Sequence, residues 1–357
     1  MEIRKINLPF KIKTPVLALG SQVKNTLCFA HTSLAYLSPV HQDLGELKSF
    51  LDFKRDAKGF LKKNPRLIAC DLHQDYQSTK FGQGLTSQGL QLKLIQHHHA
   101  HIASCMADNG LKNQKVIGVA FDGTGLGSEG KIWGAEFLIC DYKDFYRAGH
   151  LKEVALIGGE KAILEPWRLV AAWRGFLAPQ DKILKKIYQA NLNCPLASSM
   201  GRLFDAAGSL ILGKRNARFE AELAIELENI ANSIYHLQPK VHSYNFKIER
   251  KEKAYILNPD AMFKEISADL KAGKNKAVIA YKFHLTIAKM IEQVCLRLKK
   301  ESKLNKVALS GGVFQNKLLL SLAQGLLCEK GFLVFKHRNI SCNDSGISLG
   351  QAVIAGF

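Results

Sequence analysis

Three segments of the chain share one pattern, in which an apolar run passes directly into glycine and small polar residues. They are VLALGSQVKNT (16–26), VIGVAFDGTGLGSEG (116–130) and VALSGGVFQN (307–316). Each predicts a buried strand that opens into a tight turn, where glycine permits positive φ and a close approach of the backbone to a ligand. Two of the segments lie about a hundred residues apart, as in a fold built from two similar lobes. Together they favour an anion-binding cleft.

Apolar residues at steps of three and four predict helices between these strands. The helical segments are the second half of residues 33–64, most of residues 159–235, residues 277–302, and the C-terminal NDSGISLGQAVIAGF with Asn343, Asp344 or Ser345 as N-cap. LIACDLH (67–73) predicts another strand, and residues 241–258 a β excursion inside a mainly helical insertion. This alternation favours an α/β fold with mixed sheets and a ligand bound between the lobes.

Length and composition describe an ordinary folded protein. The 357 residues are 47% hydrophobic and 23% charged, enough for two or three domains or one bilobed unit. The eight cysteines are scattered without a CxxC pair, which is typical of reduced thiols in a cytoplasm. We expect no membrane association, because the sequence contains neither a secretory signal nor an apolar run of about 20 residues.

The net charge of +19 keeps nucleic acid open as a partner. The lysines, however, are scattered through segments such as LKKNPR and RLKKESKLNK without interleaved aromatic residues. We therefore expect a nucleic-acid partner less than a protein or small-molecule one.

The stretch LIQHHHAHIASC (94–105) places four histidines within five positions. If residues 91–109 form a helix, His97 and His101 share one face and can hold one metal ion, while His98 and His99 point elsewhere. Asp122 and Asp344 are the best carboxylate ligands, because both lie at glycine-flanked ends of predicted elements. From spacing alone, a polar helix edge and a simple N-cap explain these residues equally well. The absence of HExxH disfavours a metalloprotease.

The Ser-Gly-Gly turn at residues 310–312 could offer backbone N–H groups to a phosphate or a carbonyl oxygen, or it could be a plain turn. The chain has no GxxxxGK[ST], no GxGxxG after a strand and no GxSxG, so P-loop, Rossmann and serine-hydrolase chemistry are disfavoured. Charged residues also interrupt apolar runs in the helical insertion, where they either contact a nucleotide or form solvated helix faces: Arg168, Arg202, Asp205, Glu220 and Glu222.

Nearly the whole chain resembles the C-terminal, TsaD-like (Kae-like) carbamoyltransferase domain of HypF-type [NiFe]-hydrogenase maturation proteins. Ten blocks occur in the family's order: LPFKIKTPVLALGSQVKNTLC, ACDLHQDYQST, QHHHAHIASCMADNG, FDGTGLGSEGKIWGAEFL, EPWRLVAAW, GRLFDAAGSLIL, FEAELAIELE, YKFHLTIA, LSGGVFQNKLL and HRNISCNDSGISLGQAVIA. The resemblance implies the bilobed actin-like ATPase (ASKHA) fold. Residues 1–112 would form the first lobe with the metal-binding helix. Residues 113–357 would form the second, with a helical insertion at about 150–275 and a C-terminal helix that packs back toward the first lobe.

The resemblance also implies a site. The family's divalent metal, iron or zinc, would be held by His97, His101, Asp122 and Asp344. The catalytic turn would be Ser310, Gly311 and Gly312. An adenine nucleotide, as carbamoyl-adenylate or ATP, would contact that turn and a further set of residues: Lys24, Asn25, Gly123, Gly201, Asp205, Glu222 and Asn316.

The function implied by the family is transfer of a carbamoyl group from carbamoyl-adenylate to the C-terminal cysteine thiol of a HypE-type partner. There the group becomes a thiocyanate and then a cyanide ligand of the hydrogenase iron. The sequence departs from full-length members, because it lacks the acylphosphatase-like, zinc-finger and YrdC-like segments. We therefore expect either an excised or split domain that works with a separate YrdC-like adenylating protein, or a chain that serves another acceptor. Ser345 also replaces a glycine in the family's NDGG motif.

Two other functions stay open. The chain could be a tRNA threonylcarbamoyl transferase like TsaD or a small-molecule O-carbamoyltransferase, and the basic charge favours tRNA. It could also be a non-catalytic nucleotide-binding scaffold subunit. The QHHHAH and SGGVFQN blocks favour the HypF type.

Overall fold

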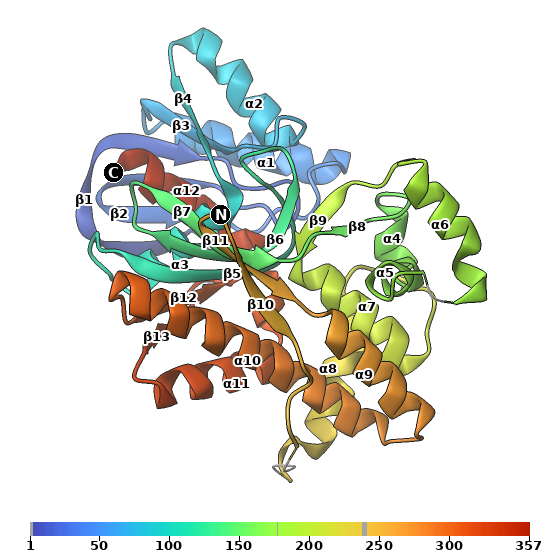
Figure 1. Ribbon diagram of the computed structural model, residues 1–357. Helices are drawn as coiled ribbons and strands as arrows, with labels where there is room; N and C mark the ends of the chain where they lie inside the picture. The colour runs from blue at the N-terminus through green and yellow to red at the C-terminus, as the bar shows by residue number, and fades with distance from the viewer. Residues whose placement is uncertain (1–2, 177, 238–240) are drawn as a thin grey trace.

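The structure, a computed structural model, describes residues 3–176, 178–237 and 241–357. Strands in these residues form a four-stranded and a nine-stranded sheet (Figure 1). The strands are β1 (Arg4–Ala18), β2 (Cys28–Leu37), β3 (Leu67–Asp71), β4 (Gln91–Ile95), β5 (Val116–Leu126), β6 (Ile132–Cys140), β7 (Phe145–Leu151), β8 (Val154–Ala155), β9 (Leu196–Ser199), β10 (Lys247–Lys251), β11 (Ala254–Asn258), β12 (Lys306–Ser310) and β13 (Leu333–Phe335).

The two sheets repeat one arrangement. In the smaller sheet, β1 pairs antiparallel with β2 on one side and parallel with β3, which is followed by β4. In the larger sheet, β5 pairs antiparallel with β6 on one side and parallel with β12, which is followed by β13. This repetition agrees with the expectation of two similar lobes. The boundary expected at residues 112 and 113 falls between β4 and β5, and it stays a prediction.

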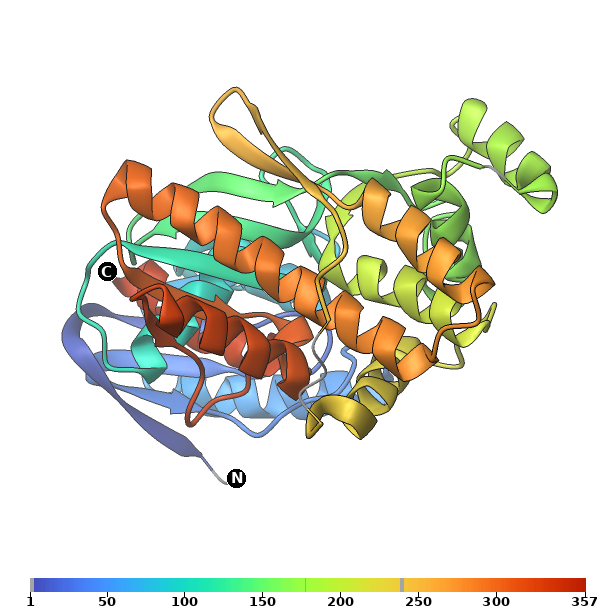
Figure 2. The ribbon, with the colours of Figure 1, turned by 60° about the horizontal axis from the view of Figure 1, so that its bottom comes forward.

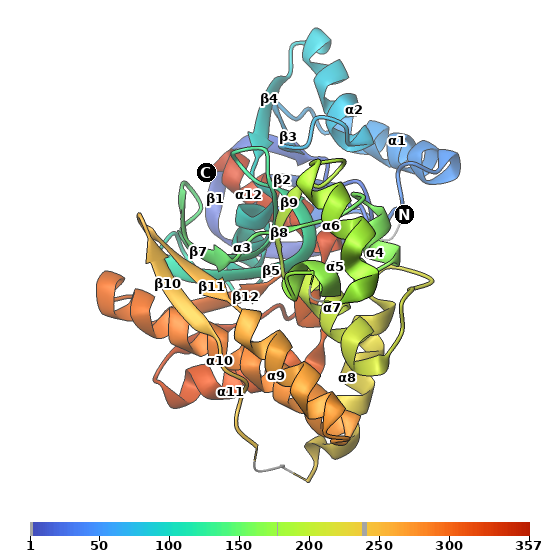
Figure 3. The same ribbon diagram turned by 45° about the vertical axis from the view of Figure 1, so that its right-hand side comes forward.

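The helices cover the sheets and fill the predicted insertion. They are α1 (Leu47–Leu61), α2 (Gln77–Leu85), α3 (His97–Asp108), α4 (Lys161–Leu164), α5 (Trp167–Trp173), α6 (Lys182–Gln189), α7 (Met200–Leu212), α8 (Glu222–Tyr235), α9 (Asp260–Lys271), α10 (Lys276–Ser302), α11 (Lys317–Glu329) and α12 (Ile347–Gly356). Figure 2 shows α10 beside α11, and Figure 3 shows α4–α8 gathered on one side of the molecule. Among the described residues, no helix combines the length and the hydrophobicity that crossing a bilayer requires.

Most of the predicted elements are present, but the sequence analysis did not predict strands β2, β6 and β7, and two of the predicted elements differ. Residues 91–95 form strand β4 rather than the first turn of the histidine helix, because the short run Gln-Leu-Lys-Leu-Ile pairs with β3. Residues 122–126 do not leave the sheet as a tight turn. They continue β5 through an irregularity in its pairing with β6, located between Phe121 and Gly125. Such a bulge redirects the side chain that it carries, which here is Asp122.

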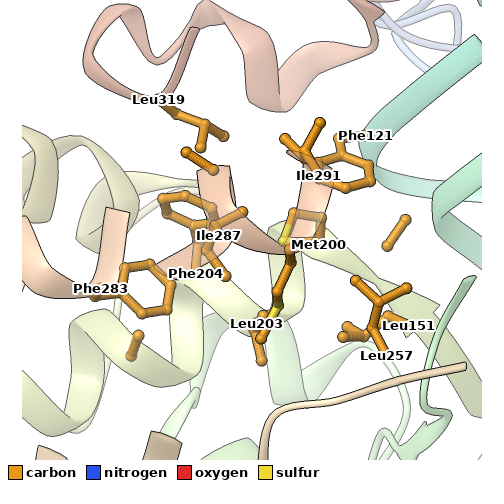
Figure 4. Close-up of a cluster of buried hydrophobic side chains, with 14 of the residues drawn as sticks. Phe121, Leu151, Met200, Leu203, Phe204, Leu257, Phe283, Ile287, Ile291 and Leu319 are labelled. Atoms are coloured by element: carbon orange, nitrogen blue, oxygen red, sulfur yellow. The ribbon is translucent and has the colours of Figure 1, made fainter. Parts of the chain in front are cut away.

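The largest hydrophobic core lies between the nine-stranded sheet and helices of the second half of the chain. Figure 4 shows side chains of β5, α7, α10 and α11 gathered in one part of it, including Phe121, Phe204, Phe283 and Leu319. A second core contains α3 and α12 together with β1 of the smaller sheet. The histidine helix therefore lies inside a packed layer rather than at a surface.

The crossing of α3 and α12 depends on Gly350. A Cβ atom on Gly350 would lie 1.8 Å from the carbonyl oxygen of Ala100, so the two backbones touch directly. This contact fixes the distance between the histidine helix and the C-terminal helix, because no side chain separates them.

We expect Gly350→Ala to lower the free energy of unfolding by at least about 2 kcal/mol, since a whole helix must move to admit the new methyl group. Gly325→Ala is the matched control. Gly325 lies at an exposed position of α11, where an added Cβ meets no described atom within 4 Å, and alanine there should raise stability by about 1 kcal/mol. Urea unfolding of the two variants measures both effects. Equal stability of the two variants would contradict the close helix contact.

Candidate metal and nucleotide site

Helix α3 begins where the chain leaves β4. Gln96 is the N-cap, and its side-chain oxygen accepts a hydrogen bond from the backbone N–H of His99 at 2.8 Å. All twelve residues of α3 are buried, so its polar side chains must find partners inside the protein. The predicted spacing holds: His97 and His101 are four residues apart and face the same way, with ring centroids 5.0 Å apart.

Four predicted ligands come together at this helix face. Nε2 of His97 and Nε2 of His101 each lie 3.3 Å from Oδ2 of Asp122, at the irregularity of β5. Asp344, in the 3₁₀ turn η4 (Asp344–Gly346) before α12, places Oδ1 at 3.9 Å and 3.7 Å from the same two nitrogens. The four ligand atoms all lie within 4.8 Å of one another.

These residues fit a metal ion. Ligand atoms about 2.1 Å from a tetrahedral zinc ion are separated by about 3.4 Å, close to the observed separations of 3.3–3.9 Å. Two imidazole nitrogens and two carboxylates also suit zinc or iron(II).

The electrostatics of the four residues also favour a cation. Burial would raise the pKa of Asp122, but its contacts with His101 and His97 outweigh burial and hold that pKa well below the usual range. Burial and the neighbouring Asp122 carboxylate raise the pKa of Asp344 to about 6. Burial opposes protonation of His97, but the surrounding carboxylates, Asp71 foremost, outweigh it and raise its pKa well above the usual value. A divalent cation would offset the repulsion between the two carboxylates.

The other two histidines of the cluster point elsewhere, as predicted. His98 lies against Trp133, with ring centroids 5.8 Å apart, and burial lowers its pKa well below the usual value. A ring nitrogen of His99, Nε2, lies 2.6 Å from the backbone oxygen of Asp141. Both histidines pack against β6, β7 or the connection between them, so we assign them a structural role.

Asp71 contacts a candidate ligand, which the sequence did not reveal. It ends β3 and is fully buried, and its Oδ2 lies 2.7 Å from Nδ1 of His97. Its other oxygen accepts the backbone N–H of His73. A carboxylate that accepts from Nδ1 of an imidazole fixes the tautomer and leaves Nε2 free to bind a metal. The only signal in the sequence was its position at the end of the predicted strand LIACDLH.

The Ser-Gly-Gly turn lies beside the same cluster. Gly311 has φ of 104°, and a Cβ there would lie 2.1 Å from the backbone oxygen of Phe121, so only glycine fits. Its N–H donates to the backbone oxygen of Cys342, and the N–H of Gly312 donates to Oδ1 of Asp122 at 3.0 Å. Ser310 is fully buried. The turn thus holds Asp122, and both glycine N–H groups have partners within the protein.

One part of the predicted nucleotide set is clustered. A Cβ on Gly201 would lie 2.8 Å from Cα of Gly123, which brings the start of α7 against the irregular part of β5. Arg202 is buried, and its guanidinium pairs with Asp205 at 2.8 Å and with Glu220 at 3.2 Å. Glu220 would also lie 2.9 Å from a Cβ on Gly123. Burial outweighs the pairing with Arg202 and raises the pKa of Asp205.

Glu222, two residues beyond Glu220, instead pairs with exposed Arg218, whose hydrogen bonds lower the Glu222 pKa. The sequence did not distinguish these two glutamates, because both lie in the run RFEAELA, across the start of α8. The geometry favours Glu220 as the residue beside Gly123, while a nucleotide contact of Glu222 stays a prediction.

The remaining predicted nucleotide residues lie in the loops that follow β1 and β12. Lys24 is exposed, whereas the buried Asn25 side chain donates to the backbone oxygens of Leu19 and Ser21. Asn316 caps α11 by accepting from the N–H of Leu319, and its amide lies 3.0 Å from Nε2 of buried His284. Asn25 and Asn316 therefore shape their loops, and contacts of either residue with a nucleotide stay predictions.

The comparisons with known proteins cover almost the whole chain. Residues 11–108 match the family model described as the HypF Kae1-like domain, and residues 118–351 match the carbamoyltransferase, Kae1-like domain, second subdomain. The chain belongs to the HypF Kae1-like carbamoyltransferase family. The resemblance seen in the ten sequence blocks is thereby confirmed.

Several members of this family are similar over nearly all of this chain. The chain is 33% identical to carbamoyltransferase HypF of Rhodobacter capsulatus, covering 97% of this chain and 47% of the relative. It is 32% identical to a carbamoyltransferase HypF homolog of Cupriavidus necator, covering 96% of this chain and 91% of that one. The chain spans about half the length of most of the curated relatives it matches.

Two solved structures agree with the fold. A full-length HypF in its phosphate- and nucleotide-bound form has a TM-score of 0.89 and 37% identity, covering 99% of this chain and 47% of that one. The HypF of T. kodakarensis has a TM-score of 0.85 and 27% identity, covering 99% of this chain and 48% of that one. The predicted α/β fold of the actin-like ATPase type is confirmed.

We expect Asp71→Asn to lower the affinity for Zn²⁺ about tenfold to a hundredfold, because the amide no longer fixes the tautomer of His97. Asp75→Asn, at an exposed position in the loop that follows β3, should leave the affinity unchanged. A competition titration with a chromophoric chelator measures both. Wild-type affinity in Asp71→Asn would show that the hydrogen bond to His97 does not orient the ligand.

We also expect His284 to make stability depend on pH. Burial lowers its pKa to about 4, below the value of about 6.5 in an unfolded chain. Between these values the unfolded state binds a proton that the folded state does not, so this contribution to stability falls as pH decreases from about 6.5 to 4. In urea titrations at several pH values, the advantage of wild type over His284→Gln should therefore be greatest near pH 7.5 and shrink toward pH 5. A constant difference would contradict the lowered pKa.

Proposed function

We propose that this chain transfers a carbamoyl group from carbamoyl-adenylate to the C-terminal cysteine thiol of a HypE-type partner, as part of [NiFe]-hydrogenase maturation. The observation that carries the proposal is the convergence of His97, His101, Asp122 and Asp344 in a chain of the HypF Kae1-like family. The ligand cluster disfavours a non-catalytic scaffold, which would need no such arrangement.

In the proposed reaction, the partner's thiolate forms a bond to the carbamoyl carbon while the bond from that carbon to the phosphate oxygen breaks. AMP leaves, and the thiol proton passes to solvent. The donor is already a mixed anhydride, so no nucleophile of this chain is needed. A divalent metal held by the four ligands would supply Lewis-acid polarisation of the carbamoyl carbonyl.

The residues of this chain then have separate tasks. Gly312 holds Asp122 through its N–H, and Asp71 fixes the imidazole of His97. These contacts pre-arrange the ligands before substrate arrives, which lowers the reorganisation needed during reaction. The turn at 310–312 was expected to bind an oxyanion. Because both glycine N–H groups are engaged, we assign it instead to the placement of Asp122.

The nucleotide is expected beside the metal site, where Gly123 and Gly201 pack together. The absence of side chains at these two glycines lets the backbone of β5 approach the N-terminus of α7, so that a ligand bound there could contact both segments. Asp205 and Glu220 lie next to them and could accept hydrogen bonds from ribose hydroxyls. The solved relative that is described as phosphate- and nucleotide-bound supports an adenine nucleotide as ligand.

The proposal includes a supply of carbamoyl-adenylate by a YrdC-like adenylating domain or protein. It also places the reaction in the cytoplasm, which the scattered, mostly buried cysteines support. The basic net charge is the observation that keeps tRNA as the second acceptor to test.

The test is intact-mass spectrometry of a HypE-type protein after incubation with this chain and supplied carbamoyl-adenylate. We expect a carbamoyl adduct that fragmentation places on the C-terminal cysteine. His101→Ala should abolish the adduct, because it removes one of the four ligands. His31→Ala, at an exposed position of β2, should retain it.

The absence of an adduct above the control without this chain would reject HypE as the acceptor. Assays with tRNA and with small hydroxyl compounds would then discriminate the two alternative transferases. An adduct that persists in His101→Ala would retain the transfer and reject the role of the metal site.

A further inference from the structure

Helix α3 has a buried carboxylate, Asp108, on the side that carries the two candidate metal ligands. His97, His101 and Asp108 lie at steps of four and seven residues, which places them along one side of the helix. The first two are candidate ligands, and Asp108 is the last residue of the helix. Its side chain is buried although it lies beyond the ligand cluster.

Asp108 binds the segment that leads to Asp344. Its carboxylate accepts hydrogen bonds from the backbone N–H groups of Arg338 at 2.6 Å, Asn339 at 3.0 Å and Ile340 at 3.4 Å. The side-chain amide of Asn339 donates to the same carboxylate at 3.0 Å. A buried carboxylate requires such donors, because leaving it without partners would be strongly unfavourable. Residues 338–340 are therefore attached to the end of the helix that carries His97 and His101.

His337 attaches the same segment to β12. Its Nε2 lies 2.8 Å from the hydroxyl oxygen of Ser310, and its Nδ1 faces Asp108 at 3.7 Å. The order of serine, histidine and aspartate resembles that of a hydrolase triad. The geometry does not support that role, because Ser310 has no exposed surface and the distance from histidine to aspartate exceeds a hydrogen bond. The contacts instead join three elements that surround the cluster.

Asp344 is the ligand that depends most on this attachment. Asp122 lies within a sheet strand, whereas Asp344 follows residues 336–343, which contain no helix or strand. Asp344 is also the carboxylate farther from the two imidazoles, at 3.7–3.9 Å compared with 3.3 Å for Asp122. Its position relative to α3 depends on α12, which follows it and packs on α3, and on the contacts of the segment that precedes it.

We propose that Asp108 and His337 are positioning residues, which hold residues 337–340 on α3 and β12 and thereby place Asp344 opposite His97 and His101. The inference rests on the proposed metal site and adds residues that act through Asp344. Neither residue is one of the four candidate ligands. Their loss should loosen the fourth ligand and leave the other three in place.

The experiment is a Zn²⁺ competition titration of the full chain and its variants. We expect Asp108→Asn and His337→Leu to lower the affinity about tenfold to a hundredfold with one metal per chain, as for other residues that orient ligands. His337→Gln should recover part of the loss, because its amide can still contact Ser310. Asp269→Asn is the matched control. Asp269 is another buried carboxylate, paired with Lys274 and Lys282 away from the ligand cluster, so its loss should not alter metal affinity.

A double-mutant cycle with Asp344→Asn separates positioning from general destabilisation. If Asp108 acts through Asp344, Asp108→Asn should have little further effect on Zn²⁺ affinity in the Asp344→Asn background. Additive losses would overturn the inference, as would wild-type affinity in both Asp108→Asn and His337→Leu. If Asp108→Asn does not fold, the same cycle is made with His337→Leu. Failure of wild type to bind Zn²⁺ would instead reject the metal site itself.

Discussion

The complete burial of α3 is the constraint on which the rest of the structure depends. None of its twelve residues is exposed, yet the helix carries four histidines and an aspartate. Each of these groups must be desolvated, so the surrounding elements have to supply partners. The apolar part of the constraint is met by close packing: Gly350 of α12 touches Ala100, and Gly118 of β5 leaves room for Ile102. For His97, His99, His101 and Asp108, the polar part is met by carboxylates and backbone groups from distant segments.

The site follows from this arrangement, because the partners come from both sheets. Asp71 ends a strand of the smaller sheet, Asp122 lies in a strand of the larger one, and both reach His97 from opposite sides. The two sheets, which share one strand arrangement, therefore both contact the imidazole ring of His97. A cation held there would be linked to both sheets, and the nucleotide expected beside Gly123 would lie next to the same strand.

Much of the fold could be predicted from sequence, because helix periodicity and strands that end in glycine are patterns of residues close together in the chain. The residue pattern also placed His97 and His101 on one helix face. It did not decide whether that face binds a metal or is only a polar edge of the helix. The family resemblance decided between them. Asp71, Asp108 and His337 could not be identified from pattern, because their contacts join residues from 26 to more than 200 positions apart. β4 was missed because five residues of mixed polarity reveal a strand only through its pairing with β3.

The two carboxylates of the ligand cluster differ in a way that follows from their supports. Asp122 is held by the N–H of Gly312 and by two imidazoles, and the imidazole contacts outweigh burial and keep its pKa low. Asp344 reaches the cluster from an irregular segment, and burial together with the charge of Asp122 raises its pKa to about 6. Asp122 is therefore held in place and ionised without a cation. A bound cation would favour the ionised form of Asp344 most. If Asp108 and His337 act as proposed, the helix that supplies two ligands also helps to place the last one, Asp344.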